Sequence, residues 1–170
     1  MAMKELMDRN ILKFIISQNI DGLHLRSGVR SNQIAELHGN VYLEFCTSCG
    51  REYLRDFHVR GPKGSKHMTG RSCESYNCQG LLKDTVINFG ENLSSENLDK
   101  SARVSALADL HVCLGSSMRV SPANIYPEMT KYAGGKVVII NLQKTPVDEI
   151  CDLVIHERID VVMKLLMSKL

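Results

Sequence analysis

Short apolar runs that turn abruptly into polar residues recur along this chain and organise its predicted fold. The runs begin near residues 14, 111, 136 and 152. Continuous apolar runs of this length are typical of strands buried on both faces of a parallel sheet. Helix-forming segments separate them, at 3–12, 94–107 and from 160 onward. Strands alternating with helices predict an α/β fold, here an incomplete Rossmann-like parallel sheet.

The same periodicity predicts which helix residues are buried. Ser94 and Ser95 offer N-caps to the helix that ends at Leu107. The residues expected on its inner face are Leu98, Ala102, Ser105 and Ala106. Asp160 is expected to cap the closing helix. The residues expected to be buried in that helix are Val162, Leu165 and Leu166.

Polar residues stand where the predicted strands end. The first strand tip carries Gln18, Asn19 and Asp21, and two later tips carry similar sets. The later sets are Gly115, Ser116 and Ser117, and Asn141, Leu142 and Gln143. In open α/β sheets ligands bind beyond the carboxyl ends of the strands, so these tips are candidates for binding a polar small molecule. The alternative at the first tip is an Asx turn, in which Asn19 and Asp21 bind nearby backbone amides.

Composition narrows the function classes. The chain has 170 residues, enough for one domain with a real core, and a formal net charge of +2. This small charge gives no strong long-range field, so direct nucleic-acid binding is not indicated, the basic loop 60–71 being the one exception. There is no run of eighteen apolar residues and no signal-like N-terminus. We therefore expect a soluble, intracellular protein with no membrane partner.

Four of the six cysteines form two close pairs, Cys46-x2-Cys49 and Cys73-x4-Cys78. Pairs spaced in this way can meet at one tetrahedral zinc ion, about 2.3 Å from each sulfur. The glycine-rich segment between the pairs is too polar and flexible to form a stable fold by itself. Zinc would therefore stabilise a module at 46–83. Four cysteine ligands leave no open coordination position, which makes the predicted site structural. The alternatives are free buried cysteines or a redox pair.

His38 is the candidate for acid–base chemistry. A neutral imidazole can take up a proton near neutral pH, and Gly39 beside it would let a ligand approach the backbone closely. The alternative is a satisfied structural histidine. Further along, 83–92 alternates well enough for a strand that ends in a loop. The alternative there is an edge strand followed by an ordinary glycine turn.

Three motifs follow one another in a specific order. They are Ser-Gln-Asn-Ile-Asp-Gly-Leu-His at 17–24, Glu-Leu-His-Gly at 36–39 and Cys-Thr-Ser-Cys at 46–49. This order resembles the sirtuin family of NAD-dependent protein deacylases, over a region from about residue 14 to 170. Within the family the chain is most similar to the nuclear, class IV branch containing sirtuins six and seven, and closer to seven at 46–49, 51–53 and 89–91. The resemblance implies a Rossmann-like domain at 1–45 and 84–170, with the zinc-binding module at 46–83 inserted.

The resemblance also implies NAD and Zn2+ as cofactors, and it assigns roles to residues of this chain. His38 matches the family's general base on the nicotinamide ribose, and Asn19 and Asp21 would orient the nicotinamide amide. The other cofactor contacts would be Gln18, Gly115, Ser116, Ser117, Asn141, Leu142, Gln143 and Ile159. An acyl-lysine peptide would add as a strand beside Ile87, Asn88, Phe89, Gly90 and Glu91.

The function implied by the resemblance is NAD-dependent protein-lysine deacetylation, in which the acyl group passes to ADP-ribose and nicotinamide is released. Its partners would be acyl-lysine proteins, with histones as candidates, and its localisation would be nuclear. The family's Gly-Ala-Gly pyrophosphate loop has no counterpart before the first strand, so Met1 resembles an internal methionine of a longer ancestor that was truncated at its N-terminus. Two alternatives stay open: a catalytically inactive, zinc-stabilised binding module and a mono-ADP-ribosyltransferase.

Overall fold

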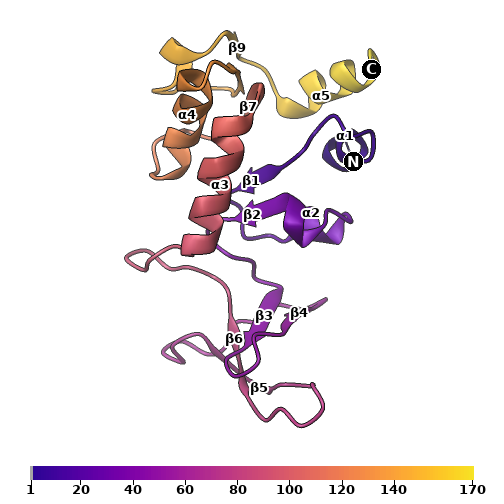
Figure 1. Ribbon diagram of the computed structural model, residues 1–170, viewed down its shortest axis with the longest axis vertical. Helices are drawn as coiled ribbons and strands as arrows, with labels where there is room; N and C mark the ends of the chain where they lie inside the picture. The colour runs from indigo at the N-terminus through magenta and orange to yellow at the C-terminus, as the bar shows by residue number, and fades with distance from the viewer. Residues whose placement is uncertain (1) are drawn as a thin grey trace. The chain divides into compact units, whose positions relative to one another are not determined.

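The computed structural model describes residues 2–170, which form two compact units (Figure 1). The first unit contains 2–16 and 95–170, and the second contains 17–94. The sequence predicted a separate zinc-binding module at 46–83, with the residues on both sides of it in the other domain. In the structure, the Leu37 amide donates to the Ser17 carbonyl over 2.9 Å and the Ile87 amide to the His38 carbonyl over 3.0 Å. The second of these bonds joins the two flanks of the cysteine module, and residues of both flanks belong to the second unit.

The first unit is built on a three-stranded parallel sheet. Its strands are β7 (Leu110–Leu114), β8 (Lys136–Ile140) and β9 (Leu153–Ile155), in the order β7-β8-β9. Leu114 pairs with Ile140, which pairs with Ile155, so the carboxyl ends of the three strands are level. The predicted α/β fold with a Rossmann-like parallel sheet is confirmed.

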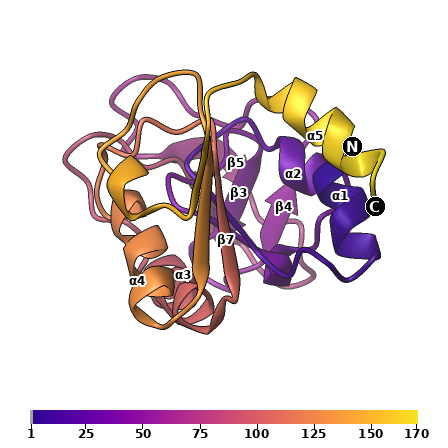
Figure 2. The same ribbon diagram turned by 90° about the horizontal axis from the view of Figure 1, so that it is seen from above.

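Helices complete the first unit. α3 (Ser95–Leu107) packs against α4 (Tyr126–Tyr132), and α4 contacts β7 and β8. Figure 2 shows α3 and α4 on the same side of β7. Short 3-10 turns, η2 (Ala123–Ile125) and η3 (Asp148–Ile150), precede α4 and β9. α1 (Ala2–Asp8), which is shorter than the helix predicted over 3–12, contacts α5 (Ile159–Met167).

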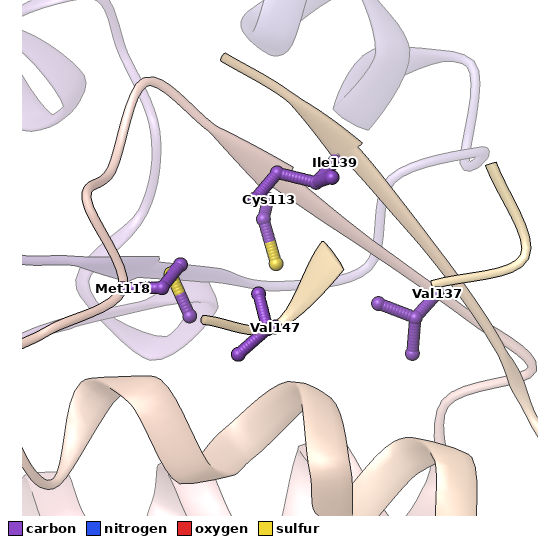
Figure 3. Packing of buried hydrophobic residues seen from close by; sticks show 5 residues of the cluster. All are labelled: Cys113, Met118, Val137, Ile139 and Val147. Atoms are coloured by element: carbon purple, nitrogen blue, oxygen red, sulfur yellow. The ribbon is translucent and has the colours of Figure 1, made fainter. Parts of the chain in front are cut away.

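The core of the first unit lies on the sheet face that α4 covers. It consists of Cys113, Met118, Val137, Ile139 and Val147, and Figure 3 shows the Cys113 sulfur directed toward Val147. Residues of the opposite face are much less covered. Leu110 and Val112 of β7 are 51% and 42% exposed. The prediction that these strands are buried on both faces is therefore wrong for β7.

The buried face of α3 differs in detail from the predicted one. The helix begins at Ser95 and ends at Leu107, as expected, but its fully buried residues are Ser101 and Ser105. Ala106, which was expected on the inner face, is exposed. Small side chains occupy the contact because α3 packs directly against α4, where the Thr130 hydroxyl donates to the Ser105 carbonyl over 2.7 Å.

The predictions for α5 are wrong at its start and on its face. The residue before the first turn is Arg158, whose backbone is extended, so Asp160 lies inside the helix and does not cap it. Met163 is the buried residue, whereas Leu165 and Leu166 are 61% and 41% exposed. α5 contacts the short helix α1.

The second unit contains the cysteine module, a four-stranded antiparallel sheet in the order β4-β3-β6-β5. The strands are β3 (Leu43–Cys46), β4 (Glu52–Leu54), β5 (Met68–Ser72) and β6 (Leu81–Asp84). The strand expected over 83–92 thus ends at Asp84. There the Asp84 carboxylate accepts the Val86 amide over 3.0 Å, which turns the chain away from the sheet.

The strand expected near residue 14 is β1 (Ile15–Ser17), and the boundary between the units falls within it. It pairs with β2 (Ile34–Glu36) in a two-stranded sheet and is not part of the three-stranded parallel sheet, contrary to expectation. α2 (Leu23–Arg26) and η1 (Ser31–Gln33) lie between β1 and β2 in the sequence. None of the helices within residues 2–170 has the length and apolar character needed to cross a lipid bilayer.

Candidate functional site

Four cysteine sulfurs meet at one point of the second unit. The Sγ atoms of Cys46, Cys49, Cys73 and Cys78 all lie within 4.8 Å of one another. The distance between sulfurs is 3.6 Å for Cys46 and Cys78, and 3.6 Å for Cys49 and Cys73. A tetrahedral zinc ion with bonds of about 2.3 Å holds its sulfurs roughly 3.8 Å apart. The donor set therefore fits a structural zinc site, and its sulfurs are too far apart for disulfides, which need about 2.05 Å.

The neighbours of two of the four sulfurs, those of Cys46 and Cys73, favour thiolates. A Cβ atom at Gly80 would lie 2.4 Å from Cys46 Sγ, so glycine is needed for the backbone to pass this sulfur. The Cys49 amide, 3.5 Å from the same sulfur, lowers the pKa of Cys46. The Tyr53 hydroxyl, 3.1 Å from Cys73 Sγ, lowers the pKa of that thiol to about 6. Zinc binds the thiolate form, which these donors favour.

The module also has an ion pair that the sequence did not reveal. Glu44 is fully buried, and its carboxylate accepts from Arg55 Nε over 2.8 Å and from Arg71 Nε over 2.9 Å. Burial alone would raise the pKa of Glu44, but hydrogen bonds, the largest from Arg71, outweigh it and lower the pKa. Arg71 also donates to the Val59 carbonyl over 2.6 Å. The segment between the cysteine pairs therefore has polar contacts of its own besides the sulfur cluster.

His38 has a defined proton arrangement. Its Nδ1 lies 2.8 Å from the Gln18 carbonyl oxygen. A carbonyl oxygen can only accept, so Nδ1 carries the proton, and in the neutral ring Nε2 is the acceptor nitrogen. Within residues 2–170, no hydrogen-bonding group is found at Nε2. This is the tautomer that a general base requires, with the lone pair free on Nε2.

Gly39 was expected to let a ligand approach the backbone closely. In the structure another part of the backbone approaches it instead. The φ of Gly39 is +75°, and a Cβ atom there would lie 1.8 Å from the Thr85 carbonyl oxygen. The close approach is to the backbone at 85–86. Beside it, the Asn40 amide donates to Thr85 Oγ1 over 3.0 Å, and the Ile87 amide donates to the His38 carbonyl. Gly39 thus allows the backbone at His38 to pack against the start of the segment that was expected to bind peptide.

Asn40 is a site residue that sequence reasoning missed. It is fully buried, and its side-chain amide donates to both carboxylate oxygens of Glu36 over 3.0 Å. A Cβ atom at Gly22 would lie 2.7 Å from Asn40 Oδ1. Asn40 therefore holds the loop at 18–22 against the loop at 36–40. A polar residue directly after the Glu-Leu-His-Gly motif was the available signal.

The first strand tip forms the Asx turn of the alternative reading and lies close to His38 in the structure. The Ile20 carbonyl accepts the Val41 amide over 2.9 Å, so this tip runs beside His38, as a shared site requires. Asp21 Oδ1 accepts the Leu23 amide over 3.1 Å, which is the Asx turn of the alternative. The Asn19 amide donates to Ser17 Oγ over 3.1 Å, and its side chain is exposed. Asn19 and Asp21 are thus both exposed at this tip.

The segment expected to bind peptide follows β6 as a turn. Ile87 is half-buried, Phe89 is fully exposed, and Gly90 has a φ of +88° with open space around it. The Glu91 carboxylate accepts the Asn88 amide over 2.7 Å, which closes the turn. This segment thus begins at Ile87, which is hydrogen-bonded to His38, and residues 88–90 are exposed to solvent.

In the first unit, three loops meet at the carboxyl edge of the parallel sheet. A Cβ atom at Gly115, where φ is +59°, would lie 2.7 Å from Ile159 Cδ1, so the end of β7 touches the start of α5. The Asn141 backbone amide donates to the Ile155 carbonyl over 3.1 Å, and its side-chain amide to the Gln143 carbonyl over 2.7 Å. The predicted residues after β7, β8 and β9 therefore lie along one edge, where α/β folds bind ligands.

A family model described as the Sir2 family matches residues 1–122. Among curated proteins, the NAD-dependent protein deacetylase SRT1 of Arabidopsis thaliana is 46% identical over 170 residues, which cover 100% of this chain and 36% of that protein. The NAD-dependent protein deacetylase sirtuin-7 of Homo sapiens is 41% identical over 181 residues, covering 100% of this chain and 44% of that protein. The chain thus spans less than half the length of these curated relatives.

Solved structures give the same match at the level of the fold. A structure titled "Sir2-p53 peptide-NAD+" has a TM-score of 0.76 and 33% identity, and the match covers 99% of this chain and 67% of that chain. A structure titled "Sir2 bound to acetylated peptide" has a TM-score of 0.77 and 32% identity, covering 99% of this chain and 68% of that chain.

Proposed function

The chain belongs to the Sir2 family, and we propose that it forms part of an NAD-dependent protein-lysine deacetylase. The observation that carries this proposal is the pairing of a histidine in the general-base tautomer with a solvent-facing backbone segment. His38 donates from Nδ1 to Gln18, and the Ile87 amide binds the His38 carbonyl. A proton acceptor and a candidate peptide-binding strand are thereby built into one unit.

In this proposal His38 Nε2 takes up the proton of a hydroxyl group, which makes that oxygen a nucleophile. Gln18 keeps the ring in the required tautomer through the 2.8 Å bond to Nδ1. Asn19 and Asp21, at the strand tip beside His38, would orient an amide ligand. Bound NAD would supply the ribose that accepts the acyl group and would release nicotinamide as leaving group.

The loops of the first unit carry residues that the resemblance assigns to binding of a dinucleotide. Gly115 is exposed and in a left-handed conformation, which lets a ligand approach the backbone. Ser116 and Ser117 would offer hydroxyls to a phosphate or ribose. Asn141, Leu142, Gln143 and Ile159 would hold the adenosine. The level carboxyl ends of β7, β8 and β9 support this assignment.

The substrate in this proposal is an acyl-lysine protein. Its backbone would pair beside 87–91, and main-chain pairing of this kind reads few side chains, so loose sequence preference is expected. Zinc held by the four cysteines would fix the fold of the module and take no part in the chemistry. Histones as substrates, a role at chromatin and a nuclear localisation are carried over from the resemblance to the nuclear branch of the family.

The test is a pair of histidine variants assayed with an acetyl-lysine peptide and NAD. We expect His38→Ala to reduce deacetylation by roughly a hundredfold or more, the usual range for loss of a general base. His58→Ala is the matched control, because His58 is an exposed histidine of the same unit whose ring nitrogen binds Tyr42. Mass spectrometry of peptide and nicotinamide gives the readout, and zinc content and thermal unfolding show whether each variant is folded.

The outcomes separate the candidate functions. Turnover that survives in His38→Ala would contradict the proposed role of this residue. ADP-ribose attached to protein, without deacetylated peptide, would indicate a mono-ADP-ribosyltransferase. Peptide binding without turnover would favour the second candidate, a zinc-stabilised binding module, which is supported by the presence of both the cysteine cluster and 87–91 in one unit.

A further inference from the structure

His67 lies between two carboxylates of the second unit. Its Nδ1 is 2.9 Å from Asp84 Oδ1, and its Nε2 is 2.9 Å from Glu91 Oε1. Ionised carboxylates only accept hydrogen bonds, so both ring nitrogens must carry protons for the two bonds to exist together. The charged, doubly protonated ring is therefore the form in which both carboxylate bonds exist. We call this pair of hydrogen bonds the His67 bridge.

The charges around the ring favour the same form. Glu91 first and then Asp84 raise the pKa of His67. The Asn88 amide first and then His67 lower the pKa of Glu91 to about 2, so this carboxylate stays ionised. Four cations line the same pocket of about 730 Å³ and oppose a further positive charge. They are Arg60, Lys63, Lys66 and Lys83. The two carboxylates at hydrogen-bond distance outweigh them.

The backbone fixes the ring in this position. Lys66 and His67 both have positive φ, 50° and 70°, a conformation that residues other than glycine rarely adopt. The Asp84 amide donates to the His67 carbonyl over 2.9 Å, which holds the strained pair against the end of β6. Strain of this kind persists where surrounding contacts hold it.

The His67 bridge fixes the far end of the turn at 88–91. The near end is held by the bond from Ile87 to His38. At the far end, Glu91 binds His67. Asn88, at the near end, accepts from Arg60 through its side chain over 2.8 Å. Phe89 and Gly90, between the two ends, are exposed. The direction of this turn therefore depends on the contacts that Asn88 and Glu91 make with the cysteine module.

We propose that His67 is a positioning residue for acyl-lysine peptide binding, holding the turn at 88–91 in its binding conformation only while its ring is doubly protonated. This inference rests on the proposed function, in which 87–91 receives the peptide. It assigns to the enzyme a dependence on pH that arises away from His38.

Loss of one proton rearranges the contacts. A neutral ring keeps a single N–H, so one of the two carboxylates loses its donor. The Asn88 side-chain nitrogen lies 3.1 Å from His67 Nε2 and 3.0 Å from Glu91 Oε1. Once Nε2 has lost its proton, this nitrogen can donate to Nε2, and the bond between His67 and Glu91 is lost. Because the folded pKa is raised, the bridge is complete below about 6.5, the ordinary histidine value, and is lost as pH rises through the folded pKa.

The experiment measures binding of a fluorescein-labelled acetyl-lysine peptide to the zinc-loaded chain by anisotropy, from pH 6 to 9. For the wild type we expect the Kd to rise roughly three- to tenfold as pH increases, the effect of losing one hydrogen bond. His67→Gln should show the weak, high-pH affinity at every pH. Glu91→Gln, at an exposed side chain, should also flatten the profile. His58→Gln is the control and should keep the wild-type profile.

A second measurement reads the bridge without peptide. At pH 6 we expect amide hydrogen exchange in 88–91 to be at least threefold faster in His67→Gln than in the wild type, with the two rates converging at pH 9. Peptide binding whose pH dependence survives in His67→Gln, or equal exchange rates at pH 6, would overturn the inference. Absence of peptide binding at every pH in every variant would instead overturn the assignment of 87–91 in the proposed function.

Discussion

Because Gly39 has no side chain, the backbone at His38 can lie against the segment expected to bind peptide. Gly39 passes the backbone at 85–86 so closely that no Cβ atom fits, and the bond between Ile87 and His38 forms next to it. The role of a glycine at this point is thus steric as well as conformational. A second glycine, Gly64, shares the left-handed backbone but has nothing within 4 Å of its Cβ position. The two positions separate the two effects.

We expect Gly39→Ala to lower the free energy of unfolding of the second unit by about 3 kcal/mol or more, because backbone atoms must move to admit the methyl group. Gly64→Ala should cost only about 1–2 kcal/mol, the strain of a left-handed alanine. Urea unfolding of both variants measures the difference. Equal losses would show that the contact with Thr85 is unimportant.

The four strands of the cysteine module are held at two places, the sulfur cluster and the buried Glu44. Each joins strands that a small sheet could not hold by apolar burial alone. The sulfurs come from β3, the β3–β4 turn and the β5–β6 loop, and the carboxylate binds Arg55 and Arg71. Metal and ion pair therefore stabilise the same strands by independent means.

Removal of zinc should unfold this module and leave the parallel sheet folded. We expect a strong chelator to abolish protection from hydrogen exchange in β3–β6, while β7–β9 remain protected, because the core around Cys113 and Val137 contains no predicted metal ligand. Exchange measured by mass spectrometry locates the change. Protection retained in β3–β6 after complete loss of zinc would contradict the structural role of the metal.

The lowered pKa of Glu44 gives the module a dependence on acid. Stability from this carboxylate is present above about 4.5, its ordinary value, and is lost as pH falls through the folded pKa. We expect Glu44→Gln to cost about 3–5 kcal/mol at pH 7, since Arg55 and Arg71 lose their shared partner, and to flatten the acid side of the stability profile. Thermal unfolding between pH 3 and 7 tests this. Stability of the Glu44→Gln protein equal to that of the wild type at pH 7 would refute it.

How much the sequence could predict differs between local and distant contacts. The parallel strands, their polar tips and the four cysteines follow from periodicity and spacing, and the resemblance to sirtuins is confirmed by the family match. The contact of Gly39 with Thr85, the Glu44 ion pair and the His67 bridge join residues that lie far apart in the sequence, and no local pattern signals them. Strand burial was overestimated because an apolar run does not show how many of its faces are covered.

Across the whole molecule, the first unit leaves part of one face of its parallel sheet exposed, although Ile140 on that face is buried. Leu110, Val112 and Leu153 share that face and are 51%, 42% and 51% exposed. Apolar strands exposed in this way favour association between molecules. The opposite face, with Val137 and Ile139, is fully buried.

We expect the isolated 170-residue chain to self-associate with increasing concentration, and the double variant Leu110→Thr, Val112→Thr to reduce this without loss of secondary structure. Val137→Thr, a matched change on the buried face, should instead lower the melting temperature. Sedimentation velocity and circular dichroism give the two readouts. Unchanged association in the double variant would show that this face is not responsible.

The hydrogen bond between the Ile87 amide and the His38 carbonyl has a consequence for how such a protein can diversify. The spacing between the proton acceptor and the peptide segment is set by main-chain atoms, so replacing the side chains of Ile87 and Phe89 leaves that spacing unchanged. In a deacetylase of the proposed kind, mutations there could shift which proteins are chosen while the chemical step keeps its alignment. Substrate selectivity and catalytic reactivity would then be able to evolve independently.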